Sequence, residues 1–179
     1  MKRTLLIFLL LSFGIYSNTG NAAGAREIDI EVDAAIEKFQ NEVGGGEKFL
    51  ASAKGVLVFP EVVKAGIGIG GEYGEGALRI NGDTVDYYST AAASIGFQLG
   101  AQIKTILLVF LEQEALDGFR SSSGWEVGVD GSVALVTLGA GKDINSINIE
   151  DPIVGFVISN KGLMYNLTLE GSKITKLKK

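Results

Sequence analysis

The first hydrophobic pattern in the chain has the period of an α-helix. Between Ile28 and Val43 the apolar positions recur at helical spacing: Val32, Ala35, Ile36, Phe39 and Val43. The opposite face is mostly acidic, and the three glycines at 44–46 end the predicted helix. A membrane-surface helix would carry Lys or Arg on its polar face, so we expect this stripe to pack on the protein's own sheet. A second short helix is predicted over residues 47–53.

The pattern then changes to that of strands. Residues 55–59 predict a buried strand, and Pro60 to Ala65 predicts a turn of helix with proline at its first position. In residues 66–70 glycine alternates with isoleucine, which leaves one strand face bare and lets another backbone come close. Residues 73–80 and 85–88 are strand-like on either side of Asn81-Gly82, a strong hairpin signal.

The second half of the chain continues with strand patterns. Residues 94–103 alternate between apolar and small or polar, and residues 105–111 are apolar without a break, which predicts a strand covered on both faces. Residues 113–119 predict a short helix. A strand over 126–138 has four candidate core residues: Val127, Val129, Val133 and Leu135. Residues 153–158 and 163–169 predict a hairpin around 160–162. The expected fold is α+β, mainly an antiparallel glycine-rich β-sheet or barrel-like core with an N-terminal amphipathic helix and short helices packed on it.

The start of the chain resembles an export signal. Lys2 and Arg3 precede an apolar run from Leu5 to Tyr16, which is short for a membrane span. The small residues up to Ala25 fit a signal-peptidase site, with cleavage expected after residue 22, 23 or 25. A retained membrane anchor is the alternative. The chain has no cysteine, so we expect an exported, periplasmic or envelope-associated protein that is not a lipoprotein, with residues 26–179 as one domain.

Composition narrows the chemistry. The chain has no histidine and no cysteine, which removes most familiar catalytic side chains. Outside the signal there are 14 basic and 21 acidic residues, since Lys2 and Arg3 account for two of the 16 basic ones. Nucleic acid is a poor partner for such a chain, because phosphates require a basic footprint.

Several blocks of the sequence resemble the SYLF-domain family, in family order from about residue 30 to 175. The residues that carry the resemblance are Lys54, Gly55, Phe59, Pro60, Gly70, Gly71, Tyr73, Gly74, Gly76, Gly96, Gly100, Gln102 and Phe110, followed by the closing blocks at 159–163 and 169–172. We expect these positions to be structural.

The resemblance implies binding to phospholipid membrane surfaces without enzymatic activity and without a cofactor. Eukaryotic members are associated with phosphoinositide membranes and actin, and bacterial members are exported envelope proteins, often lipoproteins. This chain differs in lacking the lipoprotein cysteine and in having an acidic first helix. The basic helical lipid contact of eukaryotic members therefore does not carry over to it.

The lipid contact predicted from the residues themselves is the C-terminal lysine cluster of Lys173, Lys176, Lys178 and Lys179. Lysines near anionic lipid contribute on the order of 1 kcal/mol each, but a lysine-rich tail also protects an edge strand from aggregation. Trp125, the single tryptophan, is expected in the core, with a headgroup anchor as the alternative. The glycine-faced strand at 66–70 offers another function, the docking of an envelope protein or a second copy.

Catalytic and metal-binding alternatives are weak. Gly66, Gly68 and Gly71 fit a dinucleotide fingerprint, but a poor helix start follows them. Carboxylate pairs at 72/75, 83/86, 112/114 and 150/151 lie at predicted turns or strand ends, where acids are ordinarily solvated. Asp83 and Asp130 lack the surroundings of a calcium loop. A nucleophile at Ser121–Ser123 with Lys142 as its base is discounted, because a flexible serine-rich loop explains these residues. A glycosylation acceptor at 166–168 is discounted because it lies inside a predicted strand.

Overall fold

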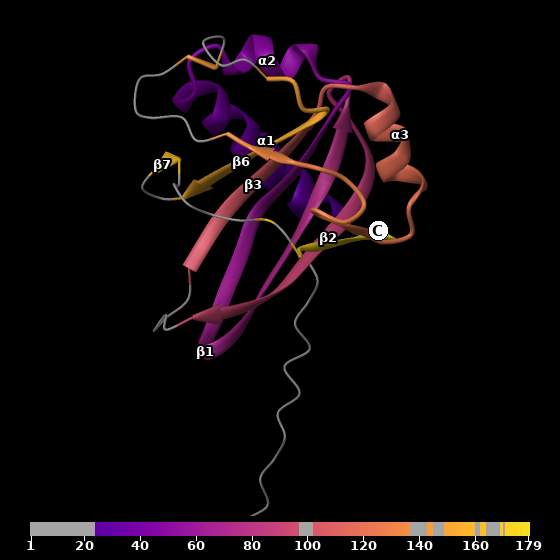
Figure 1. Cartoon of the computed structure of the whole chain (residues 1–179). Coiled ribbons are helices and arrows are strands. Elements are labelled where there is room, and N and C mark those ends of the chain that lie inside the picture. Colours follow the sequence, from indigo (N-terminus) through magenta and orange to yellow (C-terminus); the bar gives the residue numbers. More distant parts are fainter. Residues whose placement is uncertain are drawn as a thin grey trace, which may run out of the picture.

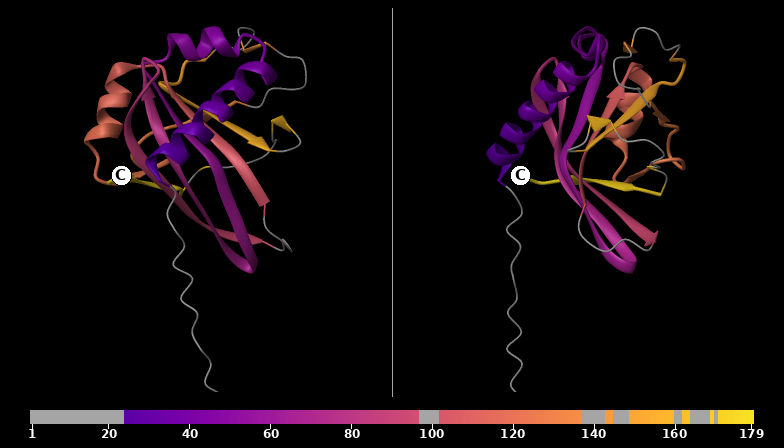
Figure 2. Two further views of the ribbon diagram at one scale, coloured as in Figure 1. Left: turned by 180° about the vertical axis from the view of Figure 1, so that it is seen from behind. Right: turned by 90° about the vertical axis from the view of Figure 1, so that its left-hand side faces the viewer.

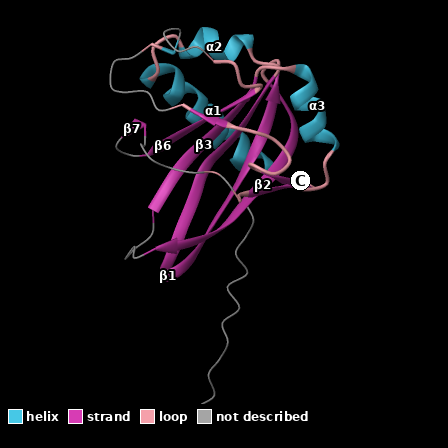
Figure 3. Ribbon diagram, viewed as in Figure 1, coloured by secondary structure: helices cyan, strands magenta, loops and turns pink. Residues whose placement is uncertain are grey.

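The computed structural model describes residues 24–96, 102–136, 143–144, 149–159, 162–163, 169 and 171–179. Its helices are α1 (Ala25–Glu42), α2 (Gly46–Ser52) and α3 (Gln113–Ser121). Its strands are β1 (Gly55–Ile80), β2 (Asp83–Gly96), β3 (Gln102–Phe110), β4 (Trp125–Glu126), β5 (Ala134–Leu135), β6 (Ile153–Ser159), β7 (Gly162–Leu163) and β8 (Lys173–Leu177). These elements form the predicted α+β fold around a curled, mostly antiparallel sheet (Figures 1 and 3).

Along the described part of the sheet the strand order is β4-β8-β2-β1-β3-β6-β5, with β7 paired to β6. Only the β5–β6 pairing is parallel. At its centre lies one very long hairpin, because β2 and then β3 follow β1 in almost constant register, from Ile80↔Asp83 to Gly55↔Phe110. The hairpin turns at Asn81-Gly82, as predicted, with positive φ at both residues (53° and 90°).

The long hairpin is folded back on itself. A Cβ placed on Gly76 would collide with the carbonyl oxygen of Val58, and one on Gly74 would lie 2.6 Å from that of Glu61. Residues 58 and 76 would be about 60 Å apart in a straight strand. The two halves of β1 therefore lie against each other, and Figure 1 shows β1 turning back at the lower end of the molecule. A close backbone approach is thus present at positions 74 and 76; the approach predicted for the period-two glycines of residues 66–70 stays a prediction.

Two hydrophobic clusters cover the two faces of the sheet. One lies between the sheet and α1, and contains Phe39, Val58, Leu107 and Phe156. The other lies on the opposite face beneath α3, and contains Phe59, Leu108, Phe110, Phe119 and Trp125. The right-hand panel of Figure 2 shows α1 and α3 on opposite sides of the sheet. The unbroken apolar run of β3 is explained by this arrangement, since both faces of that strand are buried.

Both predicted N-terminal helices and the helix after residue 112 are confirmed. The helix predicted at 60–65 is wrong, because β1 continues through it. Pro60 instead lies at an irregularity, where the pairing with β3 shifts between Phe59 and Val62. Proline removes one backbone donor in either setting, and a bulge tolerates that loss as well as a first helical turn does.

The strand predicted over 126–138 is also wrong in its middle. A turn interrupts it after β4, with a bridge between Val127 and Gly131 and a positive φ at Gly128. As a result Val129, predicted to be in the core, is 73% exposed, whereas Val127 is buried. Of the predicted hairpin near the C-terminus, β6 and its antiparallel pairing with β7 are confirmed. Residues 164–168 lie outside the described residues.

Candidate functional site

The end of the molecule where the long hairpin folds back is formed by residues 63–73 of β1, 91–96 of β2 and the start of β3. We call it the distal end. Val63 pairs with Ile103, Tyr73 pairs with Ala91, and Ala91 pairs with Lys173. The two halves of β1 meet here, since Lys64 Nζ lies 3.5 Å from Glu72 Oε1. These pairings place Val63 beside Ile103, and Tyr73 beside Ala91 and Lys173, in two groups that together we call the row.

This row lies on the same face of the sheet as α1, but farther along the strands, beyond the part that α1 covers. Val62 belongs to the cluster under α3, so its neighbour Val63 is on the opposite face. Ile103 has the same parity as Leu107, and Tyr73 the same parity as Ala77, both of which pack in the α1 cluster. At the distal end no described residue covers these side chains. Val63 is 40% exposed, Ile103 47% and Tyr73 51%.

Apart from Lys64, Glu72, Lys104 and Lys173, the sequence next to this row contains two uncharged stretches. Residues 65–71 read AGIGIGG and residues 91–103 read AAASIGFQLGAQI. Exposed large apolar side chains are ordinary when scattered, but a contiguous apolar area commonly marks an interaction surface. The distal end thus has an exposed apolar row, and the sequence next to it is poor in charge in a protein that is otherwise acidic.

Three charged groups near the distal end, Lys64, Glu72 and Lys104, lie on the face of the sheet opposite the row, where one carboxylate pairs with two lysines. Glu72 forms an ion pair with Lys104, whose Nζ lies 2.5 Å from Oε2. It forms a second, longer ion pair with Lys64 at 3.5 Å. The Lys104 side chain is 7% exposed and that of Glu72 is 13% exposed. Buried charges persist only when paired in this way. Lys64, Glu72 and Lys104 thus lie on the face opposite the exposed apolar side chains of the row.

The boundary between the apolar row and the rest of its face of the sheet is polar. The Tyr73 hydroxyl donates a 2.8 Å hydrogen bond to Glu75 Oε1, and Lys179 Nζ donates to Oε2 of the same carboxylate at 2.8 Å. Partial burial, followed by the hydrogen bond to Glu75, raises the pKa of Tyr73 to about 12. Tyr73 therefore stays neutral under physiological conditions, with its ring in the apolar row and its hydroxyl at the polar boundary.

The four C-terminal lysines predicted as a headgroup contact are not equivalent. Residues 173–177 form β8, which pairs with β2 and β4. Lys176 Nζ lies 2.5 Å from Asp86 Oδ1, and Lys179 is paired with Glu75. Lys173 and Lys178 are exposed, and Lys173 stands at the end of the apolar row. The structure thus gives two of the four lysines an internal partner and places one beside the distal end.

The residues that carry the family resemblance lie mainly in the core of the hairpin. Phe59 and Phe110 are fully buried, and Gly55 packs against Leu116, since an added Cβ would lie 3.0 Å from its Cδ1. The buried Pro60 carbonyl accepts a 2.7 Å hydrogen bond from Thr105 Oγ1. Exposed members are Lys54, Gly71, Tyr73 and Gln102. The structural role predicted for this group fits the buried positions; Gly100 lies outside the described residues.

The described residues form no site for the alternative chemistries. Gly66, Gly68 and Gly71 lie within β1, and no helix begins after them, so a dinucleotide fingerprint does not form. Of the carboxylates at predicted pairs, Glu72, Glu75 and Asp86 are held by lysine or arginine partners. Among the described residues no three Asp or Glu side chains come together as a metal site. Lys142 and residues 166–168 lie outside the described residues.

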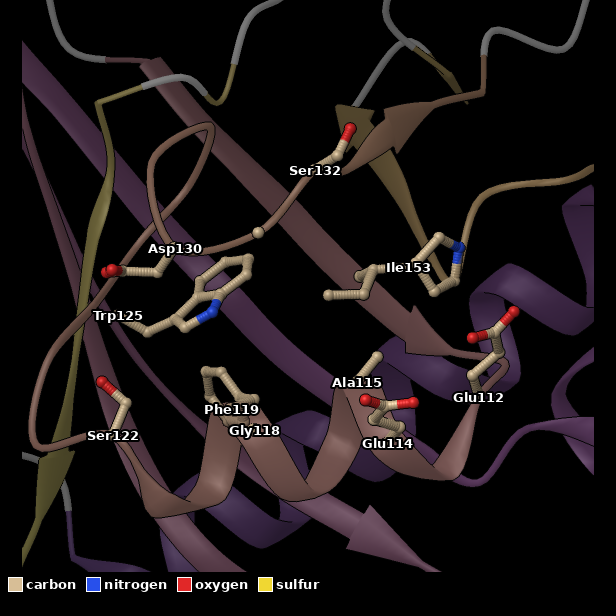
Figure 4. Close-up of a pocket in the computed structure, with 12 residues that line it drawn as sticks. Glu112, Glu114, Ala115, Gly118, Phe119, Ser122, Trp125, Asp130, Ser132 and Ile153 are labelled. Atoms are coloured by element: carbon tan, nitrogen blue, oxygen red, sulfur yellow. The ribbon is translucent and has the colours of Figure 1, made fainter.

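A cavity of about 530 Å³ lies on the other side of the sheet, between α3, the turn after β4 and the start of β6 (Figure 4). Its floor is apolar, from Phe119, Trp125 and Ile153, and its rim carries Glu112, Glu114 and Asp130. Trp125 is 4% exposed, which confirms the predicted burial. Its indole packs so closely on Gly131 that an added Cβ there would lie 2.5 Å from the ring.

Comparison with known proteins places the chain in a family. The family model described as Ysc84, Las17-binding protein actin regulator, matches residues 91–179, which run from the middle of β2 through β8. The chain belongs to this SYLF-domain family, as the sequence blocks implied. The family is one of binding and regulatory domains. No curated protein matches the chain. Among the described helices, none is both long and apolar enough to span a membrane.

Proposed function

We propose that this protein is an exported, single-domain, non-enzymatic module of the cell envelope that binds phospholipid membranes through its distal end. The observation that carries the proposal is the row of exposed Ile103, Val63 and Tyr73, which lies next to two stretches of sequence that contain no charge. An acyl-chain boundary accepts apolar side chains and excludes charged ones. Membership of the family supports lipid binding, and the N-terminal segment supports export.

The expected affinity is modest. Fully burying a Val or Ile side chain contributes about 1.5–3 kcal/mol, so the roughly half-exposed residues of the row would contribute about 1 kcal/mol each. One lysine beside anionic lipid adds about 1 kcal/mol. The total of about 4 kcal/mol corresponds to a dissociation constant in the millimolar range. The contact is reversible, and Lys173 makes part of it sensitive to salt.

Vesicle flotation with the purified protein tests the proposal. Phosphatidylcholine vesicles with and without phosphatidylglycerol are mixed with the wild type, Ile103→Asp and Val63→Asp. Each variant removes apolar contact and adds a charge to an exposed position, so we expect at least tenfold weaker binding to both compositions. Val129→Asp is the matched control, since Val129 is exposed in the turn after β4, outside the row. We expect its binding to remain within twofold of the wild type.

The alternative function is docking of an envelope protein or a second copy through the same apolar row. Light scattering of the wild type and of Ile103→Asp separates the two. A monomer that floats with vesicles supports the membrane contact. A dimer that Ile103→Asp dissociates, together with absent flotation, would replace the lipid proposal with self-association.

A further inference from the structure

The cavity beside α3 has the features of a built ligand site that the family comparison does not assign. Its volume of about 530 Å³ lies in the range of small-molecule pockets, about 300–1,000 Å³. It has an apolar floor, and polar and charged residues stand around it. The walls come from three separate parts of the chain, at residues 112–125, 130–132 and 152–153.

The first polar group is a hydrogen-bond donor without a partner. Trp125 is 4% exposed, and its indole nitrogen, which is not closed off from solvent, makes no hydrogen bond to a described residue. Figure 4 shows this nitrogen on the edge of the ring turned toward Phe119 and the open space of the cavity. A buried tryptophan ordinarily finds an acceptor for its N–H. An acceptor atom on a bound molecule would satisfy it.

The second feature is charge. Three carboxylates stand on the rim, and no described lysine or arginine lines the cavity. Glu112 and Glu114 lie at the start of α3, where the helix dipole favours negative charge, and Glu112 caps no backbone N–H. The helix dipole does not account for Asp130, because this residue lies on the opposite wall of the cavity. Its Oδ2 accepts a 2.7 Å hydrogen bond from the backbone N–H of Glu126. Together the carboxylates favour a cation at the mouth of the cavity.

We infer that this cavity binds a small organic amine whose apolar, preferably aromatic, body carries a hydrogen-bond acceptor. The body would lie on Phe119 and Ile153, the acceptor would receive the Trp125 N–H, and the ammonium would face the rim carboxylates. Aromatic walls add a favourable cation–π contribution. The inference is independent of the membrane contact, because it uses the opposite face of the sheet.

The chain's single tryptophan is also the reporter, because it lines the cavity. Trp125 emission is titrated at low salt, up to about 10 mM of each probe, a range chosen for millimolar to micromolar affinities. The probes are phenylalaninamide, phenethylamine without the carbonyl, neutral N-acetylphenylalaninamide and anionic N-acetylphenylalanine. We expect a saturable shift with phenylalaninamide, several-fold weaker binding of phenethylamine, at least tenfold weaker binding of the neutral probe and none of the anion.

Gly118→Leu is the blocking variant. Gly118 lines the cavity and a Cβ there would touch nothing within 4 Å, so the position has room for a larger side chain, and replacing glycine inside a helix favours folding. We expect at least tenfold weaker binding of phenylalaninamide in a protein that melts no lower than the wild type. The double variant Glu112→Gln and Glu114→Gln should bind three- to tenfold more weakly. Glu47→Gln, an exposed acid on α2, is the matched control and should bind like the wild type.

Three results would overturn the inference: no saturable shift with either amine, equal binding of the anionic probe, or full binding by Gly118→Leu. Vesicle flotation of Gly118→Leu is measured alongside. Since the distal end is unchanged in this variant, its flotation should equal that of the wild type whether or not the cavity binds amines.

Discussion

The fold-back of the long hairpin depends on two glycines, and Gly76→Ala tests that dependence. A Cβ at position 76 would collide with the Val58 carbonyl oxygen and lie 2.8 Å from the Phe59 ring. Neither neighbour is free to move, because Val58 and Phe59 are fully buried in the two hydrophobic clusters. The φ angle of Gly76 is not positive, so the effect would come from the contact and not from backbone strain.

Forcing an extra carbon into a packed core costs about 1–3 kcal/mol. For a domain of this size 1 kcal/mol shifts the melting temperature by about 2–4 °C, so we expect Gly76→Ala to melt about 2–12 °C below the wild type. The assay is thermal and urea unfolding, followed by Trp125 fluorescence and by circular dichroism. Coincident transitions by the two probes would support two-state analysis.

Gly71→Ala is the matched control on the same strand. An added Cβ there meets only the Ala92 carbonyl oxygen at 3.6 Å, an ordinary contact. We expect this variant to melt at the wild-type temperature or slightly above it, because alanine restricts the unfolded chain more than glycine does. Equal stability of Gly76→Ala and Gly71→Ala would refute the close approach of the two halves of β1.

Three further predictions concern polar groups. Asp29→Ala removes the carboxylate that lies 3.6 Å from Arg79 and accepts hydrogen bonds from two β2 side chains. We expect the free energy of unfolding, measured with urea, to fall by about 1–3 kcal/mol and the amide protons of α1 to exchange faster. Burial, followed by the charge of Asp86, raises the pKa of Tyr88 from 10 to about 12. The stability that this shift contributes is present below pH 10 and should be lost as the pH rises to 12. An absorbance titration with parallel thermal melting checks this, and ionisation of Tyr88 near pH 10 would contradict it. In vesicle flotation Lys173→Ser should weaken salt-sensitive binding about fivefold, which corresponds to the 1 kcal/mol expected of one lysine. Lys179→Ser should leave binding unchanged, because Lys179 is already paired with Glu75. Equal losses in the two variants would show that the paired lysine also contacts lipid.

The sequence predicted the elements whose signals are local. Helical periodicity identified α1, continuous apolar residues identified the two-sided burial of β3, and Asn81-Gly82 identified the hairpin turn. The error at Pro60 arose because one local signal, a proline after a buried strand, fits both a helix start and a bulge. Tertiary pairing with β3 decided between them.

The candidate sites were less predictable because they depend on long-range contacts. The period-two glycines of residues 66–70 indicated a close backbone approach there, but nothing local identified Val58 and Glu61 as the partners of Gly76 and Gly74. The tail lysines were singled out by sequence proximity, whereas two of them are paired with acids about 90 and 104 positions earlier. Glu112 and Glu114 were identified as a carboxylate pair and Trp125 as a core residue, but no sequence signal brings residues 112–125 to residues 130–132 and 152–153.

The position of the distal end relative to a bilayer tests the proposed function most directly. The chain contains no cysteine, so Ile103→Cys and Val129→Cys each give a single site for an environment-sensitive fluorophore. With phosphatidylglycerol-containing vesicles, we predict that the label at position 103 shifts to the blue and is quenched by lipid-borne nitroxides, while the label at position 129 stays in water. Equal quenching at both positions, or quenching at neither under conditions where the protein floats with vesicles, would contradict a membrane contact through the distal end.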